Sequence, residues 1–259
     1  MLELDRVCFG WAPDKPVFDD LSLKIEAGEK VVILGANGCG KSTLLKLMNG
    51  LIFPQQGAVR YEGEAVTKSA LGQRPFARRF RSECALLFQH PEAMLFNPTV
   101  REEIAFGARQ LGVTDAEARV ARWAEELQLT PLLDQPHWQL SGGEKQKVAL
   151  ACVLALEPRL LLLDEPSASL DPRTIGWLID TLLDSPATVV AATHNLSLAA
   201  ELGSRCLVMG GEGRFLFDGS VEAALADLAL LETACLAHRH RHRHGGVQHS
   251  HFHLHDWGS

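Results

Sequence analysis

Residues 31–43 read Val-Val-Ile-Leu-Gly-Ala-Asn-Gly-Cys-Gly-Lys-Ser-Thr, and this stretch decides the fold. The first four residues form a short, wholly apolar run, which is typical of a strand buried on both faces. The segment after it matches the pattern G-x-x-x-x-G-K-[ST], and residues 41–49 read as a helix that Gly50 ends. A strand, a glycine-rich loop and a helix in this order predict a phosphate-binding loop made of Gly35, Ala36, Asn37, Gly38, Cys39, Gly40, Lys41, Ser42 and Thr43.

The residue types in this loop suit a bound nucleotide. Glycines permit backbone angles that wrap consecutive N–H groups around a phosphate, and the start of the helix adds partial positive charge. Lys41 would neutralise the β- and γ-phosphates, and the Ser42 hydroxyl would bind Mg²⁺. A glycine-rich turn that matches the pattern by chance is the competing interpretation. The strand before the loop and the helix after it favour the nucleotide site.

A second apolar strand, residues 160–163, ends in two acids, Asp164 and Glu165. The carboxyl end of a parallel strand lies beside the crevice where such sheets bind ligands. Asp164 suits the Mg²⁺ coordination shell, and Glu165 suits polarising a water as general base or water-orienting group. A solvated strand end is the plainer alternative, but the preceding phosphate loop favours an ATP site with Mg²⁺.

The remaining pattern indicates an α/β fold. Apolar strands at 85–88, 160–163 and 188–192 alternate with helices, which implies a mostly parallel sheet with right-handed crossovers. Residues 2–9 and 21–25 alternate apolar and polar positions, as half-buried strands do. We expect the arginine-rich residues 62–82 to form an irregular loop and residues 206–217 a hairpin. One helix should cover about 221–237, followed by a poorly ordered tail.

Composition limits the possible function classes. The net charge of −7 argues against a general nucleic-acid binder, which would need a basic face. The six cysteines show no C-x-x-C spacing, so a reduced protein is expected rather than a disulfide framework. The longest apolar run, Val148 to Leu156, is too short to cross a bilayer, so a membrane role would require a partner.

The segment Leu140-Ser141-Gly142-Gly143-Glu144-Lys145-Gln146 resembles the LSGGQ signature of ATP-binding cassette (ABC) ATPases, with Glu144 where glutamine is commoner. Ser141 and Glu144 also form a capping box that would open a helix reaching about residue 156. The resemblance covers about residues 2–235. It implies an ABC domain over residues 1–237, with a RecA-like, P-loop parallel sheet core, an N-terminal antiparallel β-subdomain and an α-helical signature subdomain at about 95–157.

The resemblance also implies roles for single residues. Trp11 stands where the family has an aromatic that stacks on adenine, although a core or surface aromatic remains the alternative. Gln89 matches the Q-loop, Asp171 the D-loop and His194 the switch histidine. The implied catalytic residues are Glu165, His194 and Gln89, and the implied Mg²⁺ ligands are Ser42, Gln89 and Asp164.

The family's assembly gives the expected partners. Two cassettes pair head to tail, so that ATP on one phosphate loop meets Ser141, Gly142 and Gly143 of the second ATPase subunit, which a homodimer would supply. The groove beside Gln89 would grip an integral membrane transporter subunit. This arrangement implies a peripheral protein on the cytoplasmic face of the cell membrane, with no nucleic-acid partner.

Residues 88–100, continuing to 103–107, resemble the energy-coupling-factor importers, in particular their nickel and cobalt branch. Met94 departs from that pattern, which has glutamine at this position. A vitamin importer of the same group is one alternative. A soluble cassette ATPase acting on DNA or ribosomes is another, although the interval between Gln89 and Ser141 is too short for a coiled coil and the chain has one cassette. A metal chaperone is a further alternative, which the complete set of motifs disfavours.

The last 22 positions, 238–259, form a histidine-rich tail. Histidine binds Ni²⁺, Co²⁺, Cu²⁺ and Zn²⁺, and a period of two would place each histidine set on one side of an extended chain. The tail is therefore a candidate Ni²⁺ or Co²⁺ site. A solvated basic tail that touches anionic lipid, or an engineered tag, would explain the same composition. The candidate ligands are His238, His240, His242, His244, His249, His251, His253 and His255.

Overall fold

A six-stranded sheet forms the centre of the computed structural model, which describes residues 1–12, 14–244 and 247–254, the segment 238–254 by its backbone alone. The strand order is β10-β9-β3-β8-β7-β6. All neighbours pair in parallel except β10 and β9, which are antiparallel. The mostly parallel sheet that the sequence predicts is therefore confirmed. Its strands are β3 (Lys30–Leu34), β6 (Cys84–Leu87), β7 (Leu160–Asp164), β8 (Thr188–Thr193), β9 (Arg205–Met209) and β10 (Phe215–Ser220).

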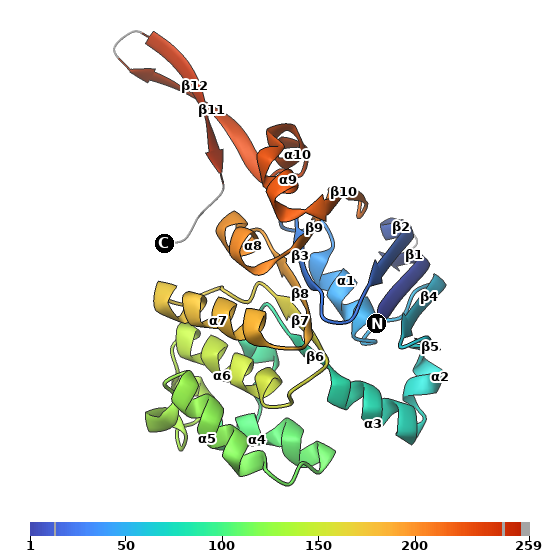
Figure 1. Cartoon of the computed structure of the whole chain (residues 1–259), viewed down its shortest axis with the longest axis vertical. Coiled ribbons are helices and arrows are strands. Elements are labelled where there is room, and N and C mark those ends of the chain that lie inside the picture. Colours follow the sequence, from blue (N-terminus) through green and yellow to red (C-terminus); the bar gives the residue numbers. More distant parts are fainter. Residues whose placement is uncertain (13, 245–246, 255–259) are drawn as a thin grey trace.

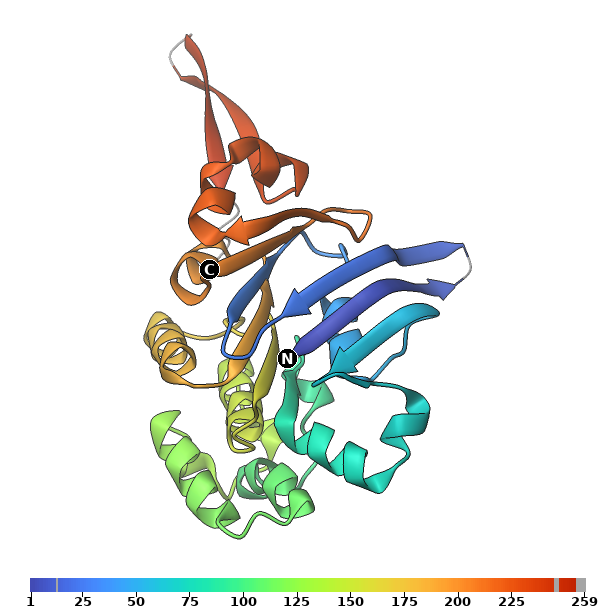
Figure 2. The same ribbon diagram turned by 45° about the vertical axis from the view of Figure 1, so that its right-hand side comes forward.

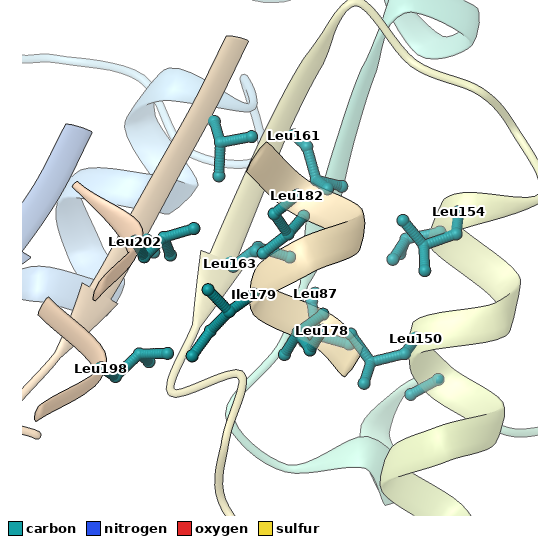
Figure 3. Packing of buried hydrophobic residues seen from close by; sticks show 14 of the residues in the cluster. Leu87, Leu150, Leu154, Leu161, Leu163, Leu178, Ile179, Leu182, Leu198 and Leu202 are labelled. Carbon is teal, nitrogen blue, oxygen red and sulfur yellow. The ribbon is translucent and has the colours of Figure 1, made fainter. Parts of the chain in front are cut away.

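Alternate residues of these strands feed two hydrophobic clusters, because side chains of a strand point to opposite faces. Leu161 and Leu163 of β7 pack against the helices α6 (Gly142–Leu154), α7 (Pro172–Asp184) and α8 (Leu196–Leu202). Figure 3 shows this packing, with leucines of the three helices around Leu163. Leu160 and Leu162 join the opposite cluster, which contains α1 (Lys41–Met48). A strand buried on both faces must be apolar throughout, as β7 is.

A second, antiparallel sheet covers α1 from the other side. It has the order β2-β1-β4-β5 and so provides the antiparallel β-subdomain that the family resemblance implies. Its inner side chains share one cluster with Leu44, Leu45 and Leu47 of α1, so that the helix lies between the two sheets (Figures 1 and 2). The strands are β1 (Leu2–Ala12), β2 (Lys15–Ile25), β4 (Gln56–Tyr61) and β5 (Glu64–Ala65).

The arginine-rich residues 62–82 differ from the loop that we expected. They contain α2 (Lys68–Leu71) and the start of α3 (Arg74–Glu83). Phe76 and Phe80 lie four residues apart, stack with their ring centroids 5.8 Å apart and are both buried. Helical spacing places the two rings on one face, and their burial stabilises a helix that the arginine content obscured.

A helical part is inserted in the chain between β6 and β7. It consists of α4 (Val100–Leu111), α5 (Ala116–Glu126) and the N-terminal end of α6, and it lies at one end of the molecule (Figure 1). Val100, Ile104 and Val120 pack in the same cluster as Leu150 of α6. In the part of the chain that the structure describes, no helix is long and apolar enough to span a membrane.

The C-terminal segment differs from the expectation in two ways. The expected single helix is divided into α9 (Val221–Ala226) and α10 (Leu228–Thr233), because Asp227 caps the second helix through the amide of Leu230. In the tail, for which we expected poor order, β11 (Ala237–His244) and β12 (Val247–Leu254) pair as an antiparallel hairpin. The alternation with period two that suits an extended chain also suits paired strands.

Candidate functional site

The predicted phosphate loop joins β3 to α1, as the sequence indicates. Gly40 precedes α1 with a φ of 108° and provides no side-chain cap. A Cβ atom at Gly40 would meet Val17 Cγ1 at 3.1 Å and the Phe18 ring at 3.2 Å. Glycine therefore lets the backbone turn under β2, and it leaves the first N–H groups of α1 for an anion.

Lys41 lies inside this loop and is buried, with 6% of its surface exposed. Its ammonium group donates hydrogen bonds to the carbonyl oxygens of Gly35, at 2.6 Å, and Ala36, at 3.2 Å. It is also 3.7 Å from Glu165 Oε1. The loop's own carbonyls thus hold the positive charge beside the predicted phosphate site and Glu165.

Asp164 is buried at the end of β7, where the sequence predicts a Mg²⁺ ligand. Burial raises the pKa of its carboxyl group, and a hydrogen bond from Ser42 opposes that rise. Among the described residues, Asp164 Oδ1 has no hydrogen-bond partner although it is buried. A buried carboxylate oxygen without a donor, next to a serine hydroxyl, fits an oxygen-seeking divalent cation such as Mg²⁺.

Glu165 follows directly and is held at three points. Thr193 Oγ1 donates to Glu165 Oε2 at 2.9 Å, and His194 Nδ1 lies 2.8 Å from Glu165 Oε1. The Glu165 amide donates to the carbonyl of Ala192 on β8 at 2.8 Å. Its φ of 48° is uncommon for a residue with a side chain, and such strain is typical of functional sites.

Part of the phosphate loop and the two acids line one cavity of about 200 Å³. Gln89, which is exposed just beyond β6, shares it with the phosphate loop and the two acids. The cavity thus unites residues from three separate segments of the chain, at the carboxyl ends of β3, β6 and β7. Its lining residues are Asn37, Gly38, Gly40, Lys41, Ser42, Thr43, Gln89, Asp164 and Glu165.

The predicted signature residues lie outside this cavity. Ser141 caps α6, and the expected capping box with Glu144 is confirmed. The Ser141 hydroxyl and amide donate to Glu144 Oε2 at 2.6 and 2.8 Å, and these bonds hold the pKa of Glu144 below its usual value. Ser141, Gly142 and Gly143 do not line the cavity of their own chain, so their contact with ATP remains a prediction.

Other predicted site residues also lie outside the cavity lining: Gly35, Ala36, Cys39, His194, Asp171 and Trp11. Asp171 caps α7: it accepts hydrogen bonds from Thr174 Oγ1 at 2.7 Å and from the Thr174 amide at 3.0 Å. These bonds lower the pKa of Asp171 to about 2. Trp11 is 58% exposed and contacts Phe9 edge to face, so its stacking on adenine remains a prediction.

Most of the tail histidines lie on the two strands of the C-terminal hairpin. His238, His240, His242 and His244 lie on β11, and His249, His251 and His253 lie on β12, whereas His255 is outside the described residues. Where side chains are described, no group of three or more histidine, cysteine or acidic residues could hold a metal ion. The metal assignment of the tail therefore stays a prediction.

Sequence reasoning missed two supporting residues. Thr193 anchors Glu165 and is fully buried, a role that its place at a strand end does not reveal. Glu103 is only 3% exposed and accepts the amides of Phe96, at 2.9 Å, and Asn97, at 2.6 Å. The sequence feature that could have revealed Glu103 is an acidic residue on the buried face of α4, among apolar residues. Glu103 thereby fixes the segment after Gln89 to the helical part.

A phosphate loop and a second strand end that carries two carboxylates, around one cavity, define the chain as a P-loop nucleoside triphosphatase. Comparisons with known proteins agree with this class. Residues 18–168 match the family model described as "ABC transporter". The nickel import ATP-binding protein NikO of Rhodobacter capsulatus is 40% identical over 242 residues, covering 90% of this chain and 94% of that protein.

Two solved structures share the fold. One is cbiO1 from Clostridium perfringens, described as part of the ABC transporter complex cbiONQ, with a TM-score of 0.73 and 28% identity. The alignment covers 89% of this chain and 92% of that one. The other is a dimeric structure of MJ0796, a bacterial ABC transporter cassette, with a TM-score of 0.74, 26% identity and coverage of 85% and 99%. The chain belongs to the ABC transporter ATPase family and is an ATP-hydrolysing cassette.

Proposed function

We propose that this ATPase powers the import of Ni²⁺ or Co²⁺ through separate membrane subunits, as a homodimer at the cytoplasmic face of the cell membrane. The observation that carries the proposal is the segment from Gln89 to Gly107, which joins the nucleotide cavity to an exposed aromatic surface and has the sequence pattern of nickel and cobalt importers. The 40% identity to NikO, a nickel import protein by name, supports the choice of substrate.

The residues around the cavity suit hydrolysis of the γ-phosphate. Lys41 and the first N–H groups of α1 would bind the phosphate oxygens. Ser42, Gln89 and Asp164 would hold Mg²⁺, which supplies charge neutralisation for the transferred phosphoryl group. Glu165 would orient the attacking water and accept its proton, with His194 and Thr193 holding the carboxylate in place.

A second copy would complete the site. Ser141 caps α6, Gly142 and Gly143 are its first residues, and all three lie outside the cavity of their own chain. The N–H groups of a first helical turn have no partner within the helix, so the amides of Gly142 and Gly143 can serve an anion. In a head-to-tail pair these amides would contact the γ-phosphate on the other copy. Asp171, at the start of α7, would lie at the same interface. The dimeric MJ0796 cassette, which shares the fold, supports such a pair.

The route to a membrane partner would run through Gln89. Phe96 and Phe106 are 64% and 39% exposed, and their rings contact edge to face with centroids 4.9 Å apart. Glu103 accepts hydrogen bonds from the backbone amides of Phe96 and Asn97. A displacement of Gln89 would therefore be passed to a segment whose backbone is fixed to the helical part. Exposed aromatic pairs of this kind are typical of protein–protein interfaces.

Reconstitution tests the proposal. The chain is expressed with the membrane proteins that co-purify with it, and the complex is placed in proteoliposomes with ATP. We expect ATP-dependent accumulation of radioactive Ni²⁺ or Co²⁺, and its loss with Glu165→Gln. Accumulation of a vitamin instead would identify the alternative importer, and the absence of any membrane partner would contradict the transport role. Phe96→Ala with Phe106→Ala should reduce co-purification while ATP binding to the isolated chain stays intact.

A further inference from the structure

The hairpin β11–β12 brings the tail histidines into direct cross-strand register. His238 is opposite His253, His240 opposite His251 and His242 opposite His249. Three alternate rungs of the hairpin thus pair histidine with histidine. An alternating sequence alone does not produce this result, because a shift of one residue on one strand would pair each histidine with a different residue type.

The same register separates the histidine positions from the arginine positions. Positions two apart on a strand share a face, so the three histidine pairs occupy one face, together with position 244. Arg239, Arg241 and Arg243 occupy the other face, opposite Phe252, Ser250 and Gln248. The strongest argument against metal binding by the tail is repulsion by its arginines. That argument weakens because the arginine positions lie on the opposite face of the hairpin from the histidine positions.

The spacing of the rungs suits a divalent transition metal. Directly opposite positions of an antiparallel pair have Cβ atoms about 4.5–5.5 Å apart, whereas diagonal positions are about 7–8 Å apart. This backbone spacing of opposite positions suits a pair of histidines that shares one ion. Imidazole nitrogen is a preferred ligand of Ni²⁺, Co²⁺, Cu²⁺ and Zn²⁺, and Ni²⁺ and Cu²⁺ bind such sites more tightly than Co²⁺.

The hairpin lies away from the nucleotide site. It extends from one end of the molecule beyond α9 and α10, whereas α4 and α5 lie at the opposite end (Figures 1 and 2). Its base is anchored, because Leu231, Leu236 and Ala237 are buried in the main cluster. The hairpin therefore stands on a buried base, apart from the Phe96 surface where a membrane subunit would dock.

We infer that the histidine face of β11–β12, on which three pairs of histidine positions lie directly opposite each other, is a binding site for divalent transition-metal ions. The choice of Ni²⁺ or Co²⁺ as the natural ligand rests on the proposed function, but the site itself rests on the register. A metal site on the ATPase, apart from the membrane path, would hold or sense the ion that the transporter moves.

Two variants of the full-length protein with equal numbers of histidines test the register. In the paired variant, His240 and His251 are kept and the other six tail histidines are replaced by threonine, which preserves strand propensity. In the offset variant, His238 and His249 are kept instead, one on each strand but not opposite. His90, His137 and His194 are present in both, so any binding by them cancels.

Calorimetric titration with NiCl₂ gives the decisive comparison. The paired variant should bind Ni²⁺ at least about tenfold more tightly than the offset variant, and the native protein more tightly than either. A variant with Arg239, Arg241 and Arg243 replaced by alanine should keep the native affinity within about threefold. Equal affinities of the paired and offset variants would show that histidine number alone matters and would overturn the inference.

The ATPase rate of each variant serves as the control for an intact cassette. Deletion of residues 238–259 should leave this rate nearly unchanged while removing Ni²⁺ binding. Retention of Ni²⁺ binding by the deleted chain would also overturn the site. This test is independent of the transport proposal. Tighter Ni²⁺ binding by the paired variant, combined with no metal uptake in proteoliposomes, would refute the proposed import and leave the hairpin site standing.

Discussion

Replacement of Glu165 by glutamine separates the chemical role of this residue from its structural role. The carboxylate is held by Thr193 Oγ1 at 2.9 Å and by His194 at 2.8 Å, and glutamine keeps an oxygen and nearly the same shape. The side chain should therefore stay in place. What glutamine cannot do is accept a proton from water, and it also removes the negative charge 3.7 Å from Lys41.

A positioned general base typically contributes about 100- to 10,000-fold to a rate, or about 3–5 kcal/mol in activation free energy. We expect Glu165→Gln to lower kcat by this factor. ATP affinity should stay within about threefold or rise, since the carboxylate repels the γ-phosphate. ATP should also accumulate in a dimer, because the step that would open it is blocked.

The measurements are the steady-state release of phosphate, the affinity for a fluorescent ATP analogue and the molecular mass with ATP and Mg²⁺ present. Glu212→Gln is the matched control, because Glu212 is an exposed acid in the turn between β9 and β10. It should leave all three quantities unchanged. Turnover by Glu165→Gln within about threefold of the native rate would refute the assignment of Glu165 as the water-activating group.

Four further perturbations follow from the structure. Lys41→Ala removes the buried ammonium group of the phosphate loop, so the affinity for ATP should fall about 100-fold in a fluorescence titration, with an unchanged affinity refuting the loop assignment. Glu103→Ala leaves the amides of Phe96 and Asn97 without an acceptor and should lower the free energy of unfolding by about 2–3 kcal/mol in urea. Gly143→Ala would place a Cβ atom 2.7 Å from the carbonyl oxygen of Ser169, so the melting temperature should fall, and normal stability with normal turnover would contradict this close approach. The hydrogen bonds from Thr174 lower the pKa of Asp171 to about 2. The stabilising contribution of this carboxylate is therefore present above the ordinary aspartate pKa of about 4 and is lost as pH falls towards about 2. The free energy of urea unfolding of Asp171→Asn should depend less on pH between about 4 and about 2 than that of the native protein.

The sequence by itself determined the parts that depend on neighbours along the chain. The phosphate loop, the acidic end of residues 160–165 and the capping box at Ser141 are short segments whose residue types and spacing specify a local backbone. The parallel sheet was also predictable, because strands buried on both faces must be apolar throughout and their alternation with helices leaves few topologies.

Only the tertiary structure decided which distant groups meet. It brought Thr193 and His194 to Glu165, left Asp164 Oδ1 without a donor beside Ser42, and kept Ser141 out of its own nucleotide cavity. It also showed that residues 74–83 form a helix, which is stabilised by the burial of Phe76 and Phe80. In the tail, composition predicted metal binding, but the pairing of histidine with histidine depended on register. Register is set by the way two strands meet across space, and no single strand contains that information.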